Sequence, residues 1–165
     1  MSRPSVVSDP FRFASEGRSL VDSIAVSRLE RLSDVLFDSS GEISYSLVGE
    51  RRSDGKSYFR LRASAPLGLQ CQRCLQRMEF ALELDSVLQL VRPGQEIPDA
   101  ELENDEFDAF EVSADLDVLA LLEEEILLTL PIAPRHEQCD APRPLGGVEK
   151  ESPFAALSRL RRAGT

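Results

Sequence analysis

The sequence predicts an α+β protein built on an antiparallel β-sheet. Residues 42–48, 58–65 and 78–91 alternate between apolar and polar side chains, which is the pattern of strands with one buried face. Residues 115–130 repeat apolar side chains every three or four positions, as a helix with a buried stripe does. The full prediction is a sheet with a Cys-x-x-Cys turn between two strands, packed helices and a short C-terminal helix.

The N-terminal part of the chain carries a weaker signal. Val6-Val7, with Phe11 and Phe13, predicts an opening strand. Residues 22–36 predict a helix because four apolar residues fall on one face at helical spacing. These four residues are Ala25, Leu29, Leu32 and Leu36.

The middle of the chain predicts two hairpins in succession. Residues 49–56 form a polar turn with Asp54-Gly55 at its tip, so the strands on either side of it pair. The second of these strands runs on to Cys71, and the strand at 78–91 begins soon after Cys74. The Cys-x-x-Cys motif therefore lies in the turn between two antiparallel strands and not at the start of a helix.

The C-terminal half divides into five predicted pieces. An acidic loop at 93–105 precedes a strand at 107–112, and the helix at 115–130 ends where Pro131 removes a backbone donor. Residues 1–139 are expected to form a single α+β domain. Residues 140–165 are expected to form a Pro/Gly linker and a short basic helix.

Composition and charge limit the classes of function. The 165 residues are 42% hydrophobic and 29% charged, as in an ordinary globular domain. The N-terminus lacks the apolar core of a signal peptide, so we expect a cytoplasmic protein with no membrane partner. The net charge of −10 comes from residues 93–134, which hold 13 acids and no Lys or Arg. That segment argues against a general phosphate binder but leaves basic surfaces elsewhere in the chain.

Two short motifs contain every cysteine and the only histidine of the chain. They are Cys71-Gln-Arg-Cys74 and His136-Glu-Gln-Cys139, and each spaces two soft-metal ligands by two residues. If the motifs meet, they form a Cys₃His site suited to structural Zn²⁺. The residues leave two other interpretations open, which are free, partly buried thiols and a redox pair at Cys71 and Cys74.

Several charged residues are candidates for contacts with partners. Arg73, Arg77 and the C-terminal arginines Arg159, Arg161 and Arg162 are candidate RNA contacts. The acids Glu123, Glu124 and Glu125 interrupt the apolar stripe of the helix and are candidate contacts for a basic protein. The alternative for both groups is an ordinary solvated surface.

The motifs of common enzymes are missing from the sequence. It contains no Gly-rich phosphate loop and no nucleophile elbow with a Ser/His/Asp order. A cysteine–histidine nucleophilic pair is conceivable from composition, but the paired spacing favours metal binding or structure. We therefore expect a protein that is not an enzyme and that takes no small-molecule substrate.

The ordered set of motifs resembles the YceD family, whose members are described as large ribosomal RNA subunit accumulation proteins. The resemblance covers roughly residues 40–162. It is carried by Cys71-Gln-Arg-Cys74, by Glu-Glu-Glu-Ile-Leu-Leu-Thr-Leu before Pro131, by Pro134-Arg-His136 with Cys139, and by Ser152-Pro-Phe-Ala-Ala-Leu157.

The resemblance implies a factor for synthesis, processing or stability of 23S ribosomal RNA and for assembly of the large subunit. Its expected partners are 23S rRNA or its precursor, large-subunit ribosomal proteins, or both. Two alternatives remain from the residues themselves. One is a thiol–disulfide or thiol-based redox protein using Cys71 and Cys74, and the other is an adaptor that binds only proteins.

Overall fold

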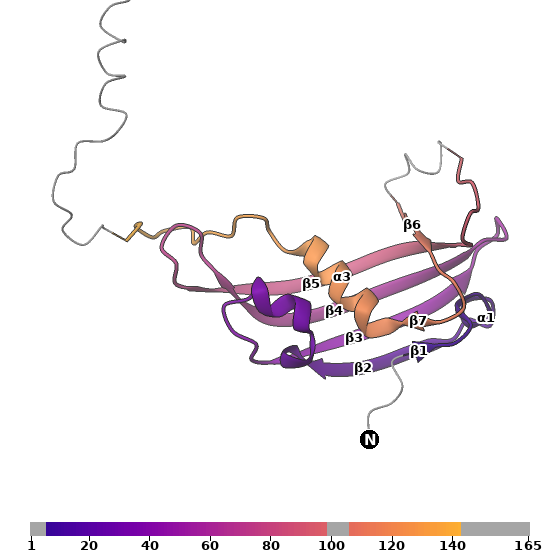
Figure 1. Cartoon of the computed structure of the whole chain (residues 1–165), viewed down its shortest axis with the longest axis horizontal. Coiled ribbons are helices and arrows are strands. Elements are labelled where there is room, and N and C mark those ends of the chain that lie inside the picture. The colour runs from indigo at the N-terminus through magenta and orange to yellow at the C-terminus, as the bar shows by residue number, and fades with distance from the viewer. Residues whose placement is uncertain (1–5, 99–105, 143–165) are drawn as a thin grey trace, which may run out of the picture.

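The computed structural model describes residues 6–98 and 106–142 of the chain (Figure 1). Its regular elements follow one another as β1 (Val6–Val7), α1 (Pro10–Ser15), β2 (Ser19–Ala25), the 3-10 turns η1 (Val26–Arg28) and η2 (Glu30–Asp34), β3 (Glu42–Arg51), β4 (Ser57–Gln70), β5 (Arg77–Val91), β6 (Asp108–Glu111), β7 (Leu116–Asp117) and α3 (Val118–Thr129).

One curved sheet dominates the architecture. Its five strands lie in the order β2-β3-β4-β5-β6, with antiparallel neighbours from β2 to β5 and a parallel pair at β5 and β6. Strands β1 and β7 form a separate antiparallel pair. Helix α3 lies across one face of the large sheet (Figure 1). These elements make the described part of the chain an α+β fold, as the sequence predicted.

The hairpin of β3 and β4 follows directly from the alternating sequence. Ile43, Leu47 and Leu61 point to one face and are completely buried. The turn at Gly55 has φ +81°, a left-handed conformation that glycine adopts without steric cost. The predicted hairpin and its inward face are therefore confirmed.

The predicted helix at residues 22–36 is wrong. Residues Ser19–Ala25 form β2, which pairs with β3 at every position of the strand. The 3-10 turns and the residues next to them still bury Leu29, Leu32 and Leu36 in the core. The apolar spacing thus identified three buried residues, although Ala25 is exposed, and pairing with β3 decided the backbone conformation.

The predicted opening strand is correct only at Val6–Val7. Phe11 and Phe13 instead belong to α1, because Asp9 caps the helix and Pro10 occupies its first turn. Phe13 packs edge-on against Phe59 of β4, with ring centroids 5.7 Å apart. This short helix therefore closes one end of the core.

The C-terminal elements lie within their predicted ranges, except that Leu116–Asp117, expected at the start of the helix, form β7 and pair with β1. The strand expected at 107–112 is β6, which runs parallel to β5. The helix expected at 115–130 is α3, and Val118, Leu122 and Ile126 bury its apolar side in the core. None of the helices in the described ranges is long and apolar enough to cross a membrane. The predicted C-terminal helix lies outside the described residues.

Candidate metal centre

The first motif lies in the tight turn that joins the two longest strands, β4 and β5. The ladder between these strands ends at the pair Gln70 and Arg77. The backbone N–H of Cys71 then donates to Gln76 O at 3.0 Å, and that of Leu75 donates to Cys71 O at 2.9 Å. Leu75 takes a φ of +62° to close the turn. The turn directs the sulfurs of Cys71 and Cys74 to the same side.

The second motif reaches this turn in the segment that follows α3. The helix ends at Thr129, and the chain then runs past Pro131 in extended or bent conformation. The N–H of Gln72 donates to Pro134 O at 2.8 Å, and the Arg73 guanidinium donates to His136 O. Backbone and side-chain hydrogen bonds therefore join the two motifs independently of their sulfurs.

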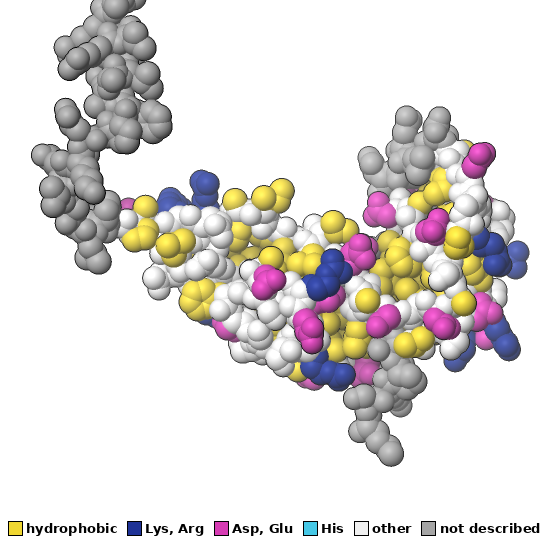
Figure 2. Space-filling view, in the orientation of Figure 1, with side chains coloured by type: hydrophobic (Ala, Val, Ile, Leu, Met, Phe, Trp, Pro, Cys, Tyr) yellow, Lys and Arg dark blue, Asp and Glu magenta, His cyan; other side chains and the backbone are white. Residues whose placement is uncertain are grey.

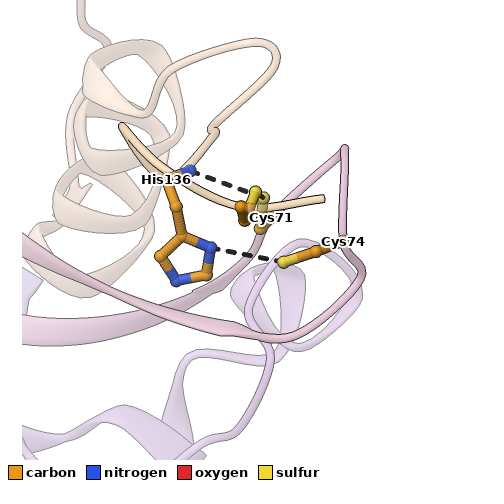
Figure 3. Close-up of side chains that lie close together, drawn as sticks. Cys71, Cys74 and His136 are labelled. Atoms are coloured by element: carbon orange, nitrogen blue, oxygen red, sulfur yellow. Dashed lines mark hydrogen bonds between the residues drawn. The ribbon is translucent and has the colours of Figure 1, made fainter. Parts of the chain in front are cut away.

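The four predicted ligands meet in space. Their donor atoms, one each from Cys71, Cys74, His136 and Cys139, all lie within 4.8 Å of one another. Cys71 Sγ lies 3.7 Å from Cys139 Sγ, and Cys74 Sγ lies 3.3 Å from His136 Nδ1. Figure 3 shows the His136 ring turned toward Cys74 and the His136 backbone nitrogen turned toward Cys71.

These distances fit a tetrahedral ion. Zinc–sulfur and zinc–nitrogen bonds at a tetrahedral angle would place two sulfurs about 3.8 Å apart, and a sulfur and a nitrogen about 3.6 Å apart. The observed 3.7 Å and 3.3 Å are close to these values. The same 3.7 Å is far longer than a disulfide bond, and all three cysteines are free thiols. The cluster is therefore close enough to hold a metal ion.

The orientation of His136 is set by its second ring nitrogen. Nε2 lies 3.2 Å from the carbonyl oxygen of Arg77, a group that can only accept a hydrogen bond. Nε2 therefore carries the proton and donates, which leaves the lone pair of Nδ1 directed at Cys74. A ligating histidine held in this way by a carbonyl is the usual arrangement in zinc proteins.

The environment of the cluster affects its thiols in opposite ways. Burial raises the pKa of Cys71, but hydrogen bonds from the backbone N–H groups of Cys74, His136 and Arg73 outweigh it and lower the pKa to about 5. Burial, together with hydrogen bonds to the sulfurs of Cys71 and Cys74, raises the pKa of Cys139. One thiolate is thus strongly favoured, and a second one beside it is disfavoured without a cation.

The predicted RNA contacts occupy different settings. Arg73 is partly buried between the two motifs, where its guanidinium bonds the His136 carbonyl. Arg77 forms an ion pair with Asp38 at 2.7 Å. Arg159, Arg161 and Arg162 lie outside the described residues. Both described arginines are therefore held by groups of the protein itself.

The acidic triplet on α3 is split between the core and the surface. Glu124 is exposed, while Glu123 and Glu125 are only 8% and 9% exposed. The Glu123 carboxylate accepts hydrogen bonds from η2, a contact that the sequence analysis did not foresee. The interruption of an apolar stripe by three acids was the signal that could have indicated it. The side chain best placed to contact a partner is Glu124.

The fold and the cluster together define the class: an α+β protein in which a Cys₃His group ties a strand–strand turn to the segment after the last described helix. The chain belongs to the family described as large ribosomal RNA subunit accumulation protein YceD, whose model matches residues 59–161. A Haemophilus influenzae protein named large ribosomal RNA subunit accumulation protein YceD is 27% identical to the chain over 169 aligned positions, which cover 93% of each protein. No solved structure matches the chain.

Proposed function

We propose that this chain is a non-enzymatic factor for synthesis, processing or stability of 23S ribosomal RNA, and thereby for assembly of the large ribosomal subunit in the cytoplasm. The observation that carries this proposal is membership of the family described as large ribosomal RNA subunit accumulation protein YceD. The name of the Haemophilus influenzae relative supports the same role. The non-enzymatic part rests on the sequence, which contains no phosphate loop or nucleophile elbow.

The partners that fit this role are precursor 23S rRNA, a basic large-subunit ribosomal protein, or both. Acidic residues on and before α3, with Glu124 exposed, suit a basic protein surface. Arg73, Arg77 and the C-terminal arginines remain candidate RNA contacts. For Arg77 such a contact would have to compete with Asp38, which accepts its hydrogen bond at 2.7 Å.

The ion that suits the Cys₃His cluster is structural Zn²⁺. Cys71, Cys74 and Cys139 would supply thiolate ligands, and His136 would supply a neutral imidazole. A divalent cation would neutralise thiolates that burial otherwise keeps from ionising together. Its role would be to hold the segment after α3 against the β4–β5 turn, so that both form one surface.

A thiol-based redox role is the second candidate, and one observation favours it. The low pKa of Cys71, about 5, makes its thiolate abundant at neutral pH. A reversible disulfide between Cys71 and Cys74, with loss of a cellular redox activity in Cys74→Ser, would support this candidate. Tight zinc binding that protects all three thiols from alkylation would exclude it.

The decisive experiment is deletion of the gene followed by complementation. We expect the deletion to lower the ratio of 23S to 16S rRNA and to reduce large subunits in a sucrose gradient. Wild-type protein should restore both and should co-sediment with precursor large-subunit particles. Unchanged 23S levels in the deletion strain, with no co-sedimentation, would refute the proposed function.

A further inference from the structure

A second surface with a strong local charge lies at the opposite end of β4 and β5 from the metal centre. Here α1, the β3–β4 turn and the end of β5 enclose a shallow groove of about 360 Å³. Its lining contains three arginines, Arg12, Arg51 and Arg92, and a single carboxylate, Asp9. In a chain with a net charge of −10, this concentration of positive charge is unusual. Figure 2 shows dark blue side chains at this end of the molecule, with acidic ones between them.

Two of the three arginines have no carboxylate partner among the residues that the structure describes. Arg51 is exposed, and its Nε makes a long hydrogen bond of 3.3 Å to Gly55 O. Arg92 is exposed and lies over the Phe11 ring, with its guanidinium carbon 4.3 Å from the ring centroid. Both guanidinium groups therefore keep most of their donors available for an anion.

The carboxylates near the groove are already in use. Asp9 caps α1, accepting a hydrogen bond from the N–H of Arg12 at 2.9 Å. Glu16 pairs with the Arg12 guanidinium at 2.7 Å, but the Arg12 side chain is 71% exposed. An exposed pair of this kind contributes little and exchanges readily for another anion. The residues that line the groove thus have a net positive charge, and their guanidinium groups can donate hydrogen bonds to an anion.

The arrangement around Phe11 selects the kind of anion. A guanidinium plane that rests on an aromatic ring presents its free face and edge to solvent, where it binds phosphate oxygens and stacks on bases. Three arginines in one groove match the repeating charges of a nucleic-acid strand better than a single phosphate. The side chain of Ser57, which also lines the groove, adds a hydroxyl group suited to the same oxygens.

We propose that the groove of Arg12, Arg51 and Arg92 binds the phosphate backbone of single-stranded ribosomal RNA. The choice of RNA as the ligand rests on the proposed function, whereas the existence of an anion-binding site is inferred from the residues of the groove. Arg51 and Arg92 have no carboxylate partner among the described residues, whereas Arg77 pairs with Asp38 and the part-buried Arg73 donates to the His136 carbonyl. The protein would therefore hold RNA at the α1 end, away from the metal centre.

The test compares two double variants of the full-length protein. Arg51→Gln with Arg92→Gln removes two charges from the groove. Arg28→Gln with Arg31→Gln is the control and removes the same charge from two exposed positions. These positions follow the end of β2 that is farther from α1, and the strand itself is roughly 20 Å long. Binding to fluorescent oligouridine, followed by anisotropy from about 50 to 200 mM KCl, gives the affinity and its salt dependence.

The groove variant should bind about tenfold or more weakly, and the slope of log K against log salt should fall by about 1 for each arginine removed. The control should bind as the wild type does. Arg51→Lys with Arg92→Lys keeps the charge, so its slope should match the wild type while its affinity falls. A thermal melt of each variant separates loss of binding from loss of folding.

Equal binding by the groove variant and the wild type would overturn the proposal. So would the absence of any RNA binding by the wild type, or competition by polyglutamate as effective as by RNA, which would indicate an acidic protein ligand. These outcomes leave the proposed function standing if the deletion strain still shows a lowered ratio of 23S to 16S rRNA. Conversely, normal 23S rRNA levels in the deletion strain, with salt-dependent RNA binding lost in the groove variant, would refute the proposed function and support the binding site.

Discussion

The backbone N–H of Arg31 in η2 donates a hydrogen bond to the side-chain carboxylate of Glu123 in α3. The Glu123 Oε1 atom lies 2.5 Å from Arg31 N and 3.2 Å from Leu32 N. The Glu123 carboxylate is buried, and these two N–H groups supply the hydrogen bonds that a buried carboxylate needs. One acidic side chain therefore connects α3 to the 3-10 turn η2, which also contains the buried residue Leu32.

Replacing Glu123 by alanine should destabilise the protein more than the same replacement of its exposed neighbour Glu124. Glu123→Ala leaves the N–H of Arg31 without its acceptor, whereas the N–H of Leu32 keeps a bond to Leu29 O at 3.2 Å. One unpaired donor of this kind costs about 1–3 kcal/mol. Glu124→Ala removes the same charge from an exposed site and should change the free energy of unfolding by less than about 0.5 kcal/mol. Urea unfolding followed by circular dichroism measures both. Equal effects of the two variants would show that the contact with η2 contributes nothing.

Glu125 should make the stability depend on pH in the opposite direction to most acids. Burial, the largest cause, and the nearby charges of Asp108 and Glu124 raise its pKa above the 4.5 of a free side chain, although Ser86 bonds it. The folded state therefore binds a proton more tightly than the unfolded state. The contribution of this group to stability is present below about 4.5 and is lost as the pH rises through the folded pKa.

Glu125→Gln should consequently be more stable than the wild type at neutral pH. The amide keeps a hydrogen-bonding group for Ser86 and removes the buried charge, so the melting temperature should rise by about 2–4 °C. The difference between the two proteins should shrink as the pH falls toward and below 4.5, because the wild-type carboxyl then becomes increasingly protonated in both states. A difference that stays constant from neutral pH to that value would contradict the argument.

The central hairpins and the candidate metal ligands of the first motif could be predicted because their signals are local. Alternation with period two, a turn at Asp54-Gly55 and the x₂ spacing of Cys71 and Cys74 each act within a few residues. That His136 and Cys139 could meet the first motif was a hypothesis from ligand type, and the structure brings the four side chains together. The contacts that bring them there, such as Gln72 N–H to Pro134 O, involve backbone atoms and leave no pattern in the sequence.

The errors of prediction arise where distant contacts decide the local structure. Residues 22–25 have both helical and strand character, and pairing with β3 selected the strand. The parallel direction of β6 depends on a long connection after β5, whose path the composition does not specify. The burial of Glu123 required knowledge that η2 would present the backbone N–H groups of Arg31 and Leu32 to α3.

Gly49 of β3 is needed for the approach of α1 to the sheet. A Cβ atom at this position would lie 2.6 Å from Ala14 Cα and 2.8 Å from Phe13 O, both of which are backbone atoms that cannot move alone. Gly49→Ala should therefore displace α1 and cost about 1–3 kcal/mol. Ser44→Ala, at an exposed position of the same strand, is the control. If the two variants unfold at the same urea concentration, α1 tolerates the displacement.

The Cys₃His cluster should bind one Zn²⁺ per chain and depend on all four ligands. Cys139→Ser replaces a thiolate by a hydroxyl, a poor ligand for zinc, and should lower both the metal content and the melting temperature. Because bound metal stabilises only the folded state, a strong chelator should lower the melting temperature of the wild type by at least about 4 °C. The same chelator should leave Cys139→Ser unchanged.

Gln138→Ala provides the matched control, since it alters the neighbouring residue and keeps every ligand. Replacing the ion by Co²⁺ adds a direct test, because tetrahedral thiolate coordination gives intense visible absorption that octahedral sites lack. That absorption should weaken in Cys139→Ser and persist in Gln138→Ala. Wild-type protein without metal, and with a melting temperature insensitive to the chelator, would mean that the two motifs are held together by their hydrogen bonds, through Gln72, Arg73 and the ring of His136.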